Sequence, residues 1–260
     1  MPTEQAPGDL VIRAATGADA EALRDLYLAT RKAAEPAMPP QIHTPEEVLA
    51  HIREGLERHE VWVAADAGSG AVVGFAKIAG DWLDSLYVTP GNQGEGVGTT
   101  LLDLTKAQRP RGFALWVFTD NEAARRFYRH RGLVELEHTD GAGNEERTPD
   151  VRMDWPGEEP MAYLRAGIDA VDDEIAVLLA RRQALTAAVQ DHKERDSGFS
   201  GHAGRDRDRE RAIAERMARH APGLGVERMA RVVDAVISVS LDAWEKRRDT
   251  SAEGHGGEVG

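Results

Sequence analysis

The sequence has no cysteine, and this absence excludes several kinds of site. Disulfide bonds, zinc centres with thiolate ligands and thiol nucleophiles all need that side chain. The nine histidines form no His-Glu-x-x-His pair, so no metal site is expected. No stretch reaches the ~20 apolar residues that cross a bilayer, and the N-terminus lacks a signal-peptide pattern. These absences predict a cytoplasmic protein that uses neither a metal nor a membrane.

Positive charge is also scarce. Lysine and arginine number 32 against 45 aspartates and glutamates, which gives a formal net charge of -13 at pH 7. Phosphate backbones bind basic surfaces, so nucleic acid is not an expected partner. The length of 260 residues allows two modest domains. Strand-like patterns stop at a Pro/Gly-rich stretch, and we therefore expect domains at 1–156 and 161–248, a linker at 157–160 and a disordered tail at 249–260.

Glycine is concentrated between a predicted strand at Trp82–Val88 and a predicted helix. Four glycines lie in the segment Pro90–Thr100, just ahead of the helix. Such a loop lets backbone amides approach an anion such as pyrophosphate, and the helix dipole favours negative charge there. It is not a P-loop, because no Gly-Lys-Ser/Thr follows. Taken alone, the loop is equally well explained as a plain turn.

The residues around this loop resemble two motifs of the GNAT superfamily of acetyl-CoA-dependent acyltransferases. The first motif, Q/R-x-x-G-x-G/A, is matched by Gln93, Gly96 and Gly98. The second follows a predicted strand at 113–118 and reads Asn-x-x-Ala-x-x-Phe-Tyr-x-x-x-Gly-Phe. It is matched by Asn121, Ala124, Phe127, Tyr128 and Gly132, with Leu133 in the last place. The resemblance spans roughly Leu10 to Trp155.

The resemblance implies an α/β (α+β) fold with a mixed central sheet, splayed after Trp82–Val88 so that the pantetheine arm of acetyl-CoA lies in the gap. Backbone groups near Leu86 and Val88 would align the thioester, and Asn121 would contact the cofactor arm. The amides that would hold the pyrophosphate belong to Gln93, Gly94, Glu95, Gly96, Val97, Gly98 and Thr99.

The same resemblance implies that Tyr128 protonates the departing thiolate. A phenol suits this role because its pKa of ~10 exceeds that of a thiol. The alternative is a ring that only packs against the sheet. No general base is evident. Asp84 projects from the expected strand, but a carboxylate there is equally expected as a solvated residue.

In the second half, an apolar stripe at heptad spacing runs through Met161–Lys193, and it predicts one continuous helix roughly 50 Å long. A domain of this size cannot cover such a helix alone, so a second copy of the chain is expected to do so. Arg182 interrupts the stripe. A buried cation needs an anion, which is either a carboxylate of the partner subunit or an anionic ligand inside a helical dimer.

The order of a long, a short and a long predicted helix resembles the all-helical (type II) chorismate mutases. The match consists of Leu164-Arg165-x-x-Ile168-Asp169-x-x-Asp172, Leu178-Leu179-x-x-Arg182, Lys193 and Asp206-x-x-Arg209-Glu210. It needs a short extra insertion in Glu194–Gly204, which we expect to be a flexible loop. It covers about Met161 to Lys246. The resemblance implies an all-α fold of three helices that forms an intertwined dimer and converts chorismate to prephenate by a Claisen rearrangement.

This second resemblance also assigns roles. Arg182 and Arg165 of the partner subunit would bind the two carboxylates, where a bidentate guanidinium fits. Lys193 would face the ether oxygen, and Ser240 would line the pocket. Asp206, Arg209 and Glu210 would contact the side of chorismate that carries the ring hydroxyl. Trp244 departs from the family pattern, which usually places Gln or Glu there to hydrogen-bond the ether oxygen. Its indole N–H could substitute as a donor, or its bulk could change the substrate or weaken catalysis.

The sequence thus predicts a bifunctional homodimer, an acetyl-CoA-dependent N-acetyltransferase of an unidentified amine fused to a chorismate mutase. Two alternatives remain open for the helical half. In one it acts on aminodeoxychorismate or isochorismate. In the other it is a non-catalytic dimerisation or ligand-sensing module that regulates the acetyltransferase.

Overall fold

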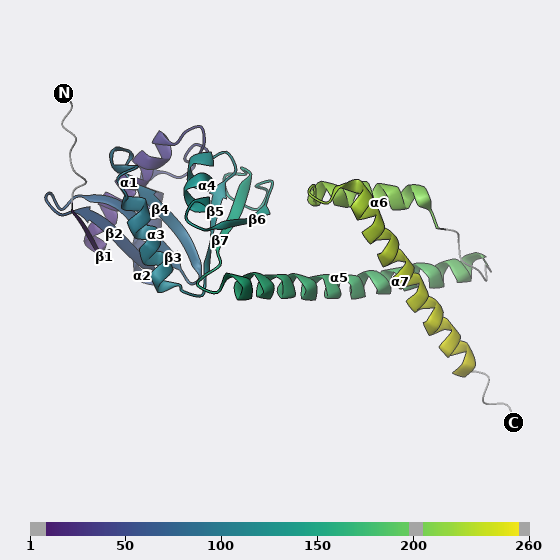
Figure 1. The fold of residues 1–260 in the computed structure, drawn as a ribbon. Helices are drawn as coiled ribbons and strands as arrows, with labels where there is room; N and C mark the ends of the chain where they lie inside the picture. Colours follow the sequence, from purple (N-terminus) through teal and green to yellow (C-terminus); the bar gives the residue numbers. More distant parts are fainter. Residues whose placement is uncertain (1–8, 198–204, 255–260) are drawn as a thin grey trace. The chain divides into compact units, whose positions relative to one another are not determined.

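The computed structural model describes residues 9–197 and 205–254, which belong to two units divided between Ala166 and Gly167 (Figure 1). The division falls inside helix α5 (Pro160–Ser197), so the first turns of this helix pack with the first unit. The expected linker at 157–160 lies just ahead of that division, and Pro160 already begins the helix.

A mixed seven-stranded sheet forms the first unit (Figure 1). Its strands are β1 (Leu10–Ala14), β2 (Glu60–Asp66), β3 (Val72–Ala79), β4 (Trp82–Val88), β5 (Phe113–Phe118), β6 (Val134–His138) and β7 (Asp150–Trp155). They follow the order β1-β2-β3-β4-β5-β7-β6, and only β4 and β5 pair in parallel. The predicted bounds of β4 and β5 are confirmed. β6 was not predicted as a strand, and it pairs with β7 in antiparallel fashion.

Helices cover both faces of the sheet. On one face lie η1 (Gly17–Asp19), α1 (Ala20–Ala33) and α2 (Pro45–Arg58), and Leu23 of α1 packs there against Val63 and Phe75. On the other lie α3 (Val97–Gln108) and α4 (Glu122–Arg129), where Leu101 packs against Ala76 and Leu115. The alternation of side chains along each strand sends neighbours to opposite faces, so one sheet supports two cores. We call them the α1 face and the α3 face.

The break between β4 and β5 is the feature that positions the candidate site. The two strands share a single register pair, Trp82 with Ala114, and then diverge. A register shift between Lys77 and Ile78 of β3 lies beside the same stretch of β4. Such a bulge increases the local twist of the strand and helps to end its pairing. The predicted splay of the sheet is therefore confirmed.

The second unit is helical. It comprises the rest of α5 together with α6 (Arg207–His220) and α7 (Gly225–Gly254), and a small core joins α6 to α7 through Ala214, Ala218, Met229 and Val233. α5 extends past Lys193 to Ser197, and α7 extends past Arg248 to Gly254, into the expected tail. Neither extension, 194–197 or 249–253, contains a glycine or proline that would end the helix. The remainder of the expected loop and tail lies outside the described residues.

In the part of the chain that the structure describes, no helix is long and apolar enough to span a bilayer.

Candidate active sites

A cavity of about 1130 Å³ opens where β4 and β5 diverge. Its walls are the facing residues 83–88 of β4 and 115–118 of β5. The end of α1, the loop before α3, helix α4 and the β6–β7 hairpin complete the lining. Residues from both faces of the sheet line the cavity, for example Tyr87 from the α1 face and Tyr128 from the α3 face.

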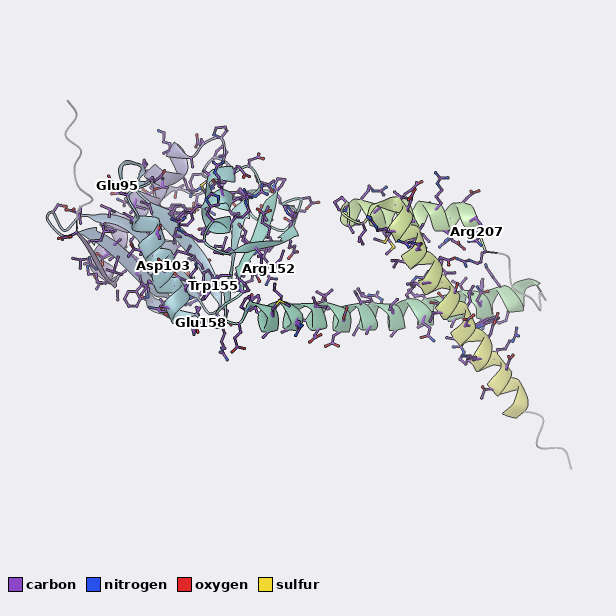
Figure 2. The ribbon with its side chains drawn as sticks, viewed as in Figure 1. Glu95, Asp103, Arg152, Trp155, Glu158 and Arg207 are labelled. Carbon is purple, nitrogen blue, oxygen red and sulfur yellow. The ribbon has the colours of Figure 1, made fainter. Side chains whose placement is uncertain are left out.

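The loop before α3 has the conformation that an anion site requires. A short 3-10 helix, η2 (Pro90–Asn92), leads into Gly94 and Gly96, whose φ angles are 87° and 90°. Only glycine adopts these angles without strain. Gly96 is the N-cap of α3, so the unpaired amides of the first helical turn begin here. Figure 2 labels Glu95 in this loop and Asp103 further along α3.

Most of the predicted cofactor residues line the cavity: Leu86, Val88, Gln93, Gly94, Gly96, Gly98, Thr99 and Asn121. Two do not. The side chain of Glu95 accepts a hydrogen bond from Asn92 Nδ2 at 2.9 Å. The side chain of Val97 is buried in the core of the α3 face. Only the backbone amides of these two residues remain available for the predicted role.

The carbonyl of Val88 is already engaged by the protein. Thr30 Oγ1 and Gln93 Nε2 each donate a hydrogen bond to it, both at 3.2 Å. Gln93 thereby fixes the glycine loop to the end of β4, a structural role in addition to the predicted contact with the pyrophosphate. The expectation that Val88 aligns a thioester does not hold for its carbonyl oxygen, because that oxygen has two donors of its own.

Tyr128 lies on α4, lines the cavity and is only 7% exposed. Burial raises the pKa of Tyr128, because an apolar surrounding disfavours the phenolate. The phenol therefore stays protonated, as a proton donor must. At the start of the same helix, Asn121 Oδ1 accepts a hydrogen bond from the Ala124 amide at 3.2 Å. This N-cap holds the Asn121 side chain in place at the wall of the cavity.

Arg131 is a lining residue that the sequence interpretation missed. Its guanidinium lies 4.0 Å from the centre of the Phe127 ring. Nη1 donates to the Phe127 carbonyl at 3.3 Å, and Nη2 donates to Thr99 Oγ1 in the first turn of α3. The buried Nε has no hydrogen-bond partner among the described residues. A positive charge therefore stands beside a glycine loop whose only charged side chain is that of Glu95.

The far end of the cavity is built by the β6–β7 hairpin and α1. Arg31 of α1, 5% exposed, donates to Glu146 Oε1 at 3.0 Å and to the Pro39 carbonyl at 3.2 Å. Asp150 accepts hydrogen bonds from Thr139 Oγ1 and, at 2.9 Å, from Asn144 Nδ2. These pairs close the hairpin against α1 and give the cavity a rim with two carboxylates, which the sequence did not indicate.

Asp84 also lines the cavity, on the α1 face. Its Oδ2 pairs with Lys77 Nζ at 2.8 Å and accepts a hydrogen bond from Ser85 Oγ at 3.0 Å. Lys77 Nζ in turn lies 3.0 Å from Nε2 of His51 on α2. The Asp84 side chain is 46% exposed and ion-paired, so it is partly solvated but not isolated.

In the helical unit, Arg182 and Ser240 come together as predicted. Arg182 Nη1 donates to Ser240 Oγ at 3.2 Å and to the Val236 carbonyl at 3.4 Å. Ser240 is 5% exposed and donates to the same carbonyl at 2.6 Å. Among the side chains that the structure describes, no carboxylate pairs with Arg182. Arg165 and Lys193 lie exposed on the same helix, α5.

The predicted cluster at the start of α6 is organised by a residue that the sequence interpretation did not include. Arg205 holds Glu210 through Nε–Oε1 and Nη2–Oε2 contacts of 2.7 and 2.9 Å, and pairs with Asp234 of α7 at 2.6 Å. Asp206 is the N-cap of α6 and accepts from the Arg209 amide at 2.9 Å. The Arg209 side chain is exposed. Asp206 and Glu210 therefore have structural partners within the chain.

Trp244 does not offer its indole N–H to the pocket. It is 7% exposed, and Nε1 donates to Asp191 Oδ1 at 2.7 Å. Arg247 Nη2 donates to both oxygens of the same carboxylate at 3.1 Å. The indole, together with Arg247, lowers the pKa of Asp191. The idea that this N–H replaces the family's Gln or Glu is therefore wrong for the single chain, because a carboxylate on α5 already takes the donor.

Two family models match separate parts of the chain. Residues 57–135 match the acetyltransferase (GNAT) domain, and residues 164–243 match chorismate mutase type II. Both resemblances inferred from the sequence are confirmed, one in each unit.

Several solved structures are similar over the first part of the chain. YjaB from Escherichia coli, in its apo form, is 22% identical with a TM-score of 0.48, over 57% of this chain and 99% of YjaB. A GCN5-related N-acetyltransferase from Rhodopseudomonas palustris is 24% identical with a TM-score of 0.47, over 56% and 94%. A GNAT superfamily phosphinothricin acetyltransferase from Sinorhizobium meliloti, in complex with acetyl-CoA, is 19% identical with a TM-score of 0.46, over 59% and 91%. No curated protein matches the chain significantly.

Proposed function

We propose that this chain, which carries a GNAT acetyltransferase domain and a chorismate mutase type II domain, catalyses one reaction with each. The first is acetyl transfer from acetyl-CoA to an amine. The second is the rearrangement of chorismate to prephenate. The observation that carries the first proposal is the cavity at the β4–β5 gap, which joins a glycine loop at a helix N-terminus to a buried tyrosine.

In the acetyltransferase, groups of the chain itself bind acetyl-CoA and supply a proton. Amides of the loop from Gly94 to Thr99 would hold the pyrophosphate at the N-terminus of α3, with Arg131 as the adjacent cation. The amine nitrogen attacks the thioester carbon, the C–N bond forms and the C–S bond breaks. Tyr128 gives its phenolic proton to the departing sulfur, since burial keeps that phenol protonated.

The charge of Arg131 is expected to matter for donor binding. Arg131→Gln should raise the KM for acetyl-CoA about tenfold or more, because a charge-assisted hydrogen bond contributes about 1.5–3 kcal/mol. The kcat should change little, since Arg131 lies beside the loop and not at the thioester. Initial rates over a range of acetyl-CoA concentrations measure both constants. Arg126→Gln, at an exposed position on α4, is the matched control. Equal KM values in both variants would show that Arg131 only joins α3 to α4.

For the mutase, the supporting observation is the half-buried guanidinium of Arg182, which no carboxylate of its own unit neutralises among the described residues. Chorismate is a dicarboxylate whose rearrangement needs neither a covalent catalyst nor a metal. The site must fix a compact conformer and stabilise charge on the breaking ether oxygen. Arg182 would bind one carboxylate through its remaining N–H groups. Lys193 would serve the ether oxygen alone, since the Trp244 indole is bonded to Asp191.

We propose that the mutase is a homodimer, because the apolar stripe of α5 is exposed to solvent in a single chain. The large apolar side chains exposed there are Ile168, Val171, Ile175, Leu178, Leu185 and Val189, and Leu178 is 62% exposed. A contiguous apolar surface of this kind on a soluble helix marks an interface. A second α5 is the partner with a matching stripe, and it would bring Arg165 of the partner subunit toward Arg182.

Sharing of the site between subunits predicts complementation. Arg165→Ala and Arg182→Ala alone should each convert chorismate at least about a hundredfold more slowly than the wild type. Co-expressed in one cell, they form heterodimers in which one site keeps both arginines, and random pairing restores about a quarter of the wild-type rate. Differently tagged chains confirm that heterodimers have formed. If tagged heterodimers are recovered and the rate stays at the level of the single variants, the two arginines do not meet across a dimer.

A second function of the helical unit is favoured by one observation, the Trp244–Asp191 hydrogen bond. With the family's usual donor missing, the same fold could bind a related dicarboxylate, such as aminodeoxychorismate or isochorismate, or could sense such a ligand without turnover. Binding of chorismate without product would support this alternative.

A further inference from the structure

Two exposed tryptophans stack beside the cavity. Trp82 of β4 and Trp116 of β5 have ring centroids 6.3 Å apart and an interplanar angle of 10°. They are 37% and 43% exposed, and Trp116 lines the cavity. Single exposed apolar residues need no explanation, but paired indoles at the mouth of a cavity form a binding surface.

This pair lies on the side of the sheet opposite the glycine loop. Leu115 and Val117, the neighbours of Trp116, are buried in the core of the α3 face. Strand alternation therefore places Trp116 on the α1 face. Phe118 lies on the same face, where the Arg31 guanidinium stands 5.8 Å from its ring. Arg131 and Tyr128 belong to the α3 face, so the donor would enter from one side of the gap and the acceptor from the other.

The charges on the acceptor side are negative. Four carboxylates line the cavity, those of Asp84, Glu137, Glu146 and Asp150, and Arg131 is the one Lys or Arg among the described lining residues. Arg131 is held by Thr99 and Phe127 at the loop. Glu146 is neutralised by Arg31. Asp84 is likewise paired with Lys77. Among the described residues, Glu137 is the exposed carboxylate of the four that has no salt bridge.

Strand register places these groups around Trp116. Trp116 of β5 pairs with Arg152 of β7, and Arg152 pairs with Glu137 of β6. Arg152, labelled in Figure 2, bonds to the buried Asp154 at 2.9 Å and covers the Trp82 ring at 5.3 Å. Its charge is thus satisfied by Asp154, and it forms a wall of the surface. Asp84 stands on the other side, on β4, two residues after Trp82.

We propose that the acetyl acceptor is a protonated amine that carries a flat aromatic ring. The ring stacks on Trp116, and the ammonium group lies near Glu137. This inference rests on the proposed acetyltransferase function. Planar indole favours a planar partner, because offset aromatic stacking adds to simple burial of area. The Glu137 carboxylate favours a cation and disfavours an acceptor that carries its own carboxylate next to the amine.

Acetyl transfer to this acceptor involves two proton losses from nitrogen. The ammonium group loses one proton to solvent, and the neutral nitrogen attacks the thioester carbon. The C–N bond forms and the C–S bond breaks. The thiolate takes the phenolic proton of Tyr128, and the second proton lost by nitrogen returns to Tyr128 through water. The products are the N-acetyl amide and the free thiol of CoA, with one proton released.

The test compares acceptors that differ in one property each. The full chain is assayed for thiol release from acetyl-CoA with 2-phenylethylamine, with 2-cyclohexylethylamine and with phenylalanine. The cyclohexyl compound keeps the charge and the size but is not flat, and phenylalanine adds a carboxylate. The expected kcat/KM for phenylethylamine exceeds that of the cyclohexyl compound about three- to tenfold. Equal values for the two amines, or a preference for phenylalanine, would overturn the inference.

Two variants test which residues cause the preference for the aromatic acceptor. Trp116→Leu should abolish the advantage of the aromatic acceptor, so that kcat/KM becomes equal for phenylethylamine and the cyclohexyl compound. Glu137→Gln should raise the KM for phenylethylamine, and Asp103→Asn, an exposed acid on α3, is its matched control. An unchanged preference in Trp116→Leu would contradict the assignment of the ring to this surface.

Failure of the aromatic-acceptor proposal can be distinguished from failure of the acetyltransferase function on which it rests. If no amine is acetylated, acetyl transfer itself is in question, and the binding of the same two amines is then measured by quenching of tryptophan fluorescence. Tighter binding of phenylethylamine that disappears in Trp116→Leu supports the aromatic site without catalysis. Equal binding of both amines overturns it.

Discussion

Tyr128→Phe is expected to slow acetyl transfer about 10²- to 10⁴-fold, the range that a positioned general acid contributes. The substitution removes one oxygen and keeps the ring, so the packing of α4 on the sheet should survive. The KM for acetyl-CoA should stay near the wild-type value, because the glycine loop and Arg131 are untouched. Single-turnover measurement of thiol release reports the chemical step directly.

Two controls sharpen this result. Tyr163→Phe removes a different phenol, one that donates to Asp154 at 2.7 Å outside the cavity, and its kcat should match the wild type. Burial raises the pKa of Tyr128, so the wild-type rate should not fall between pH 7 and about pH 9 through loss of the phenolic proton. A fully active Tyr128→Phe enzyme would mean that the ring only packs against the sheet.

Arg182→Ala is expected to reduce the conversion of chorismate to prephenate about 10²- to 10³-fold, as the loss of one preorganised charge contact does in other active sites. The matched control is Arg181→Ala. Arg181 precedes it on α5, carries the same side chain and is exposed, whereas Arg182 is half-buried against Ser240. Product formation by both variants is followed spectroscopically, and their oligomeric state by light scattering.

The same pair of variants separates the alternatives for the helical unit. A module that only dimerises would keep its assembly in both variants and would bind no dicarboxylate in either. A sensing module would bind chorismate as the wild type and lose that binding in Arg182→Ala, with no turnover in any form. If Arg181→Ala and Arg182→Ala lost turnover to the same extent, Arg182 would be no more important for catalysis than its exposed neighbour.

Much of the fold is local in origin and was predictable. The bounds of β4 and β5 follow from short apolar patterns, and the glycine loop follows from residues that adopt positive φ. α5 was predicted as one helix because its apolar stripe repeats without a break other than Gly167. Arg182 and Ser240 were both assigned to a pocket from the sequence, and they are in contact.

The parts that were not predicted depend on side chains far apart in the sequence. Arg31 and Glu146 meet across the cavity although 115 positions separate them. Arg131 reaches Thr99 because α4 packs beside α3, and Trp116 faces Trp82 because two strands meet at one register pair. The bond between Trp244 and Asp191 has the same cause, since it joins α7 to α5. No local pattern encodes such pairs.

The most direct test of a bifunctional enzyme is the fate of chorismate in the presence of the purified wild-type chain, with products identified by chromatography and mass spectrometry. Prephenate is the expected product, and Lys193→Ala is expected to abolish its formation while acetyl transfer by the same preparation is unchanged. Chorismate that stays intact with a preparation active in acetyl transfer would contradict the second catalytic function.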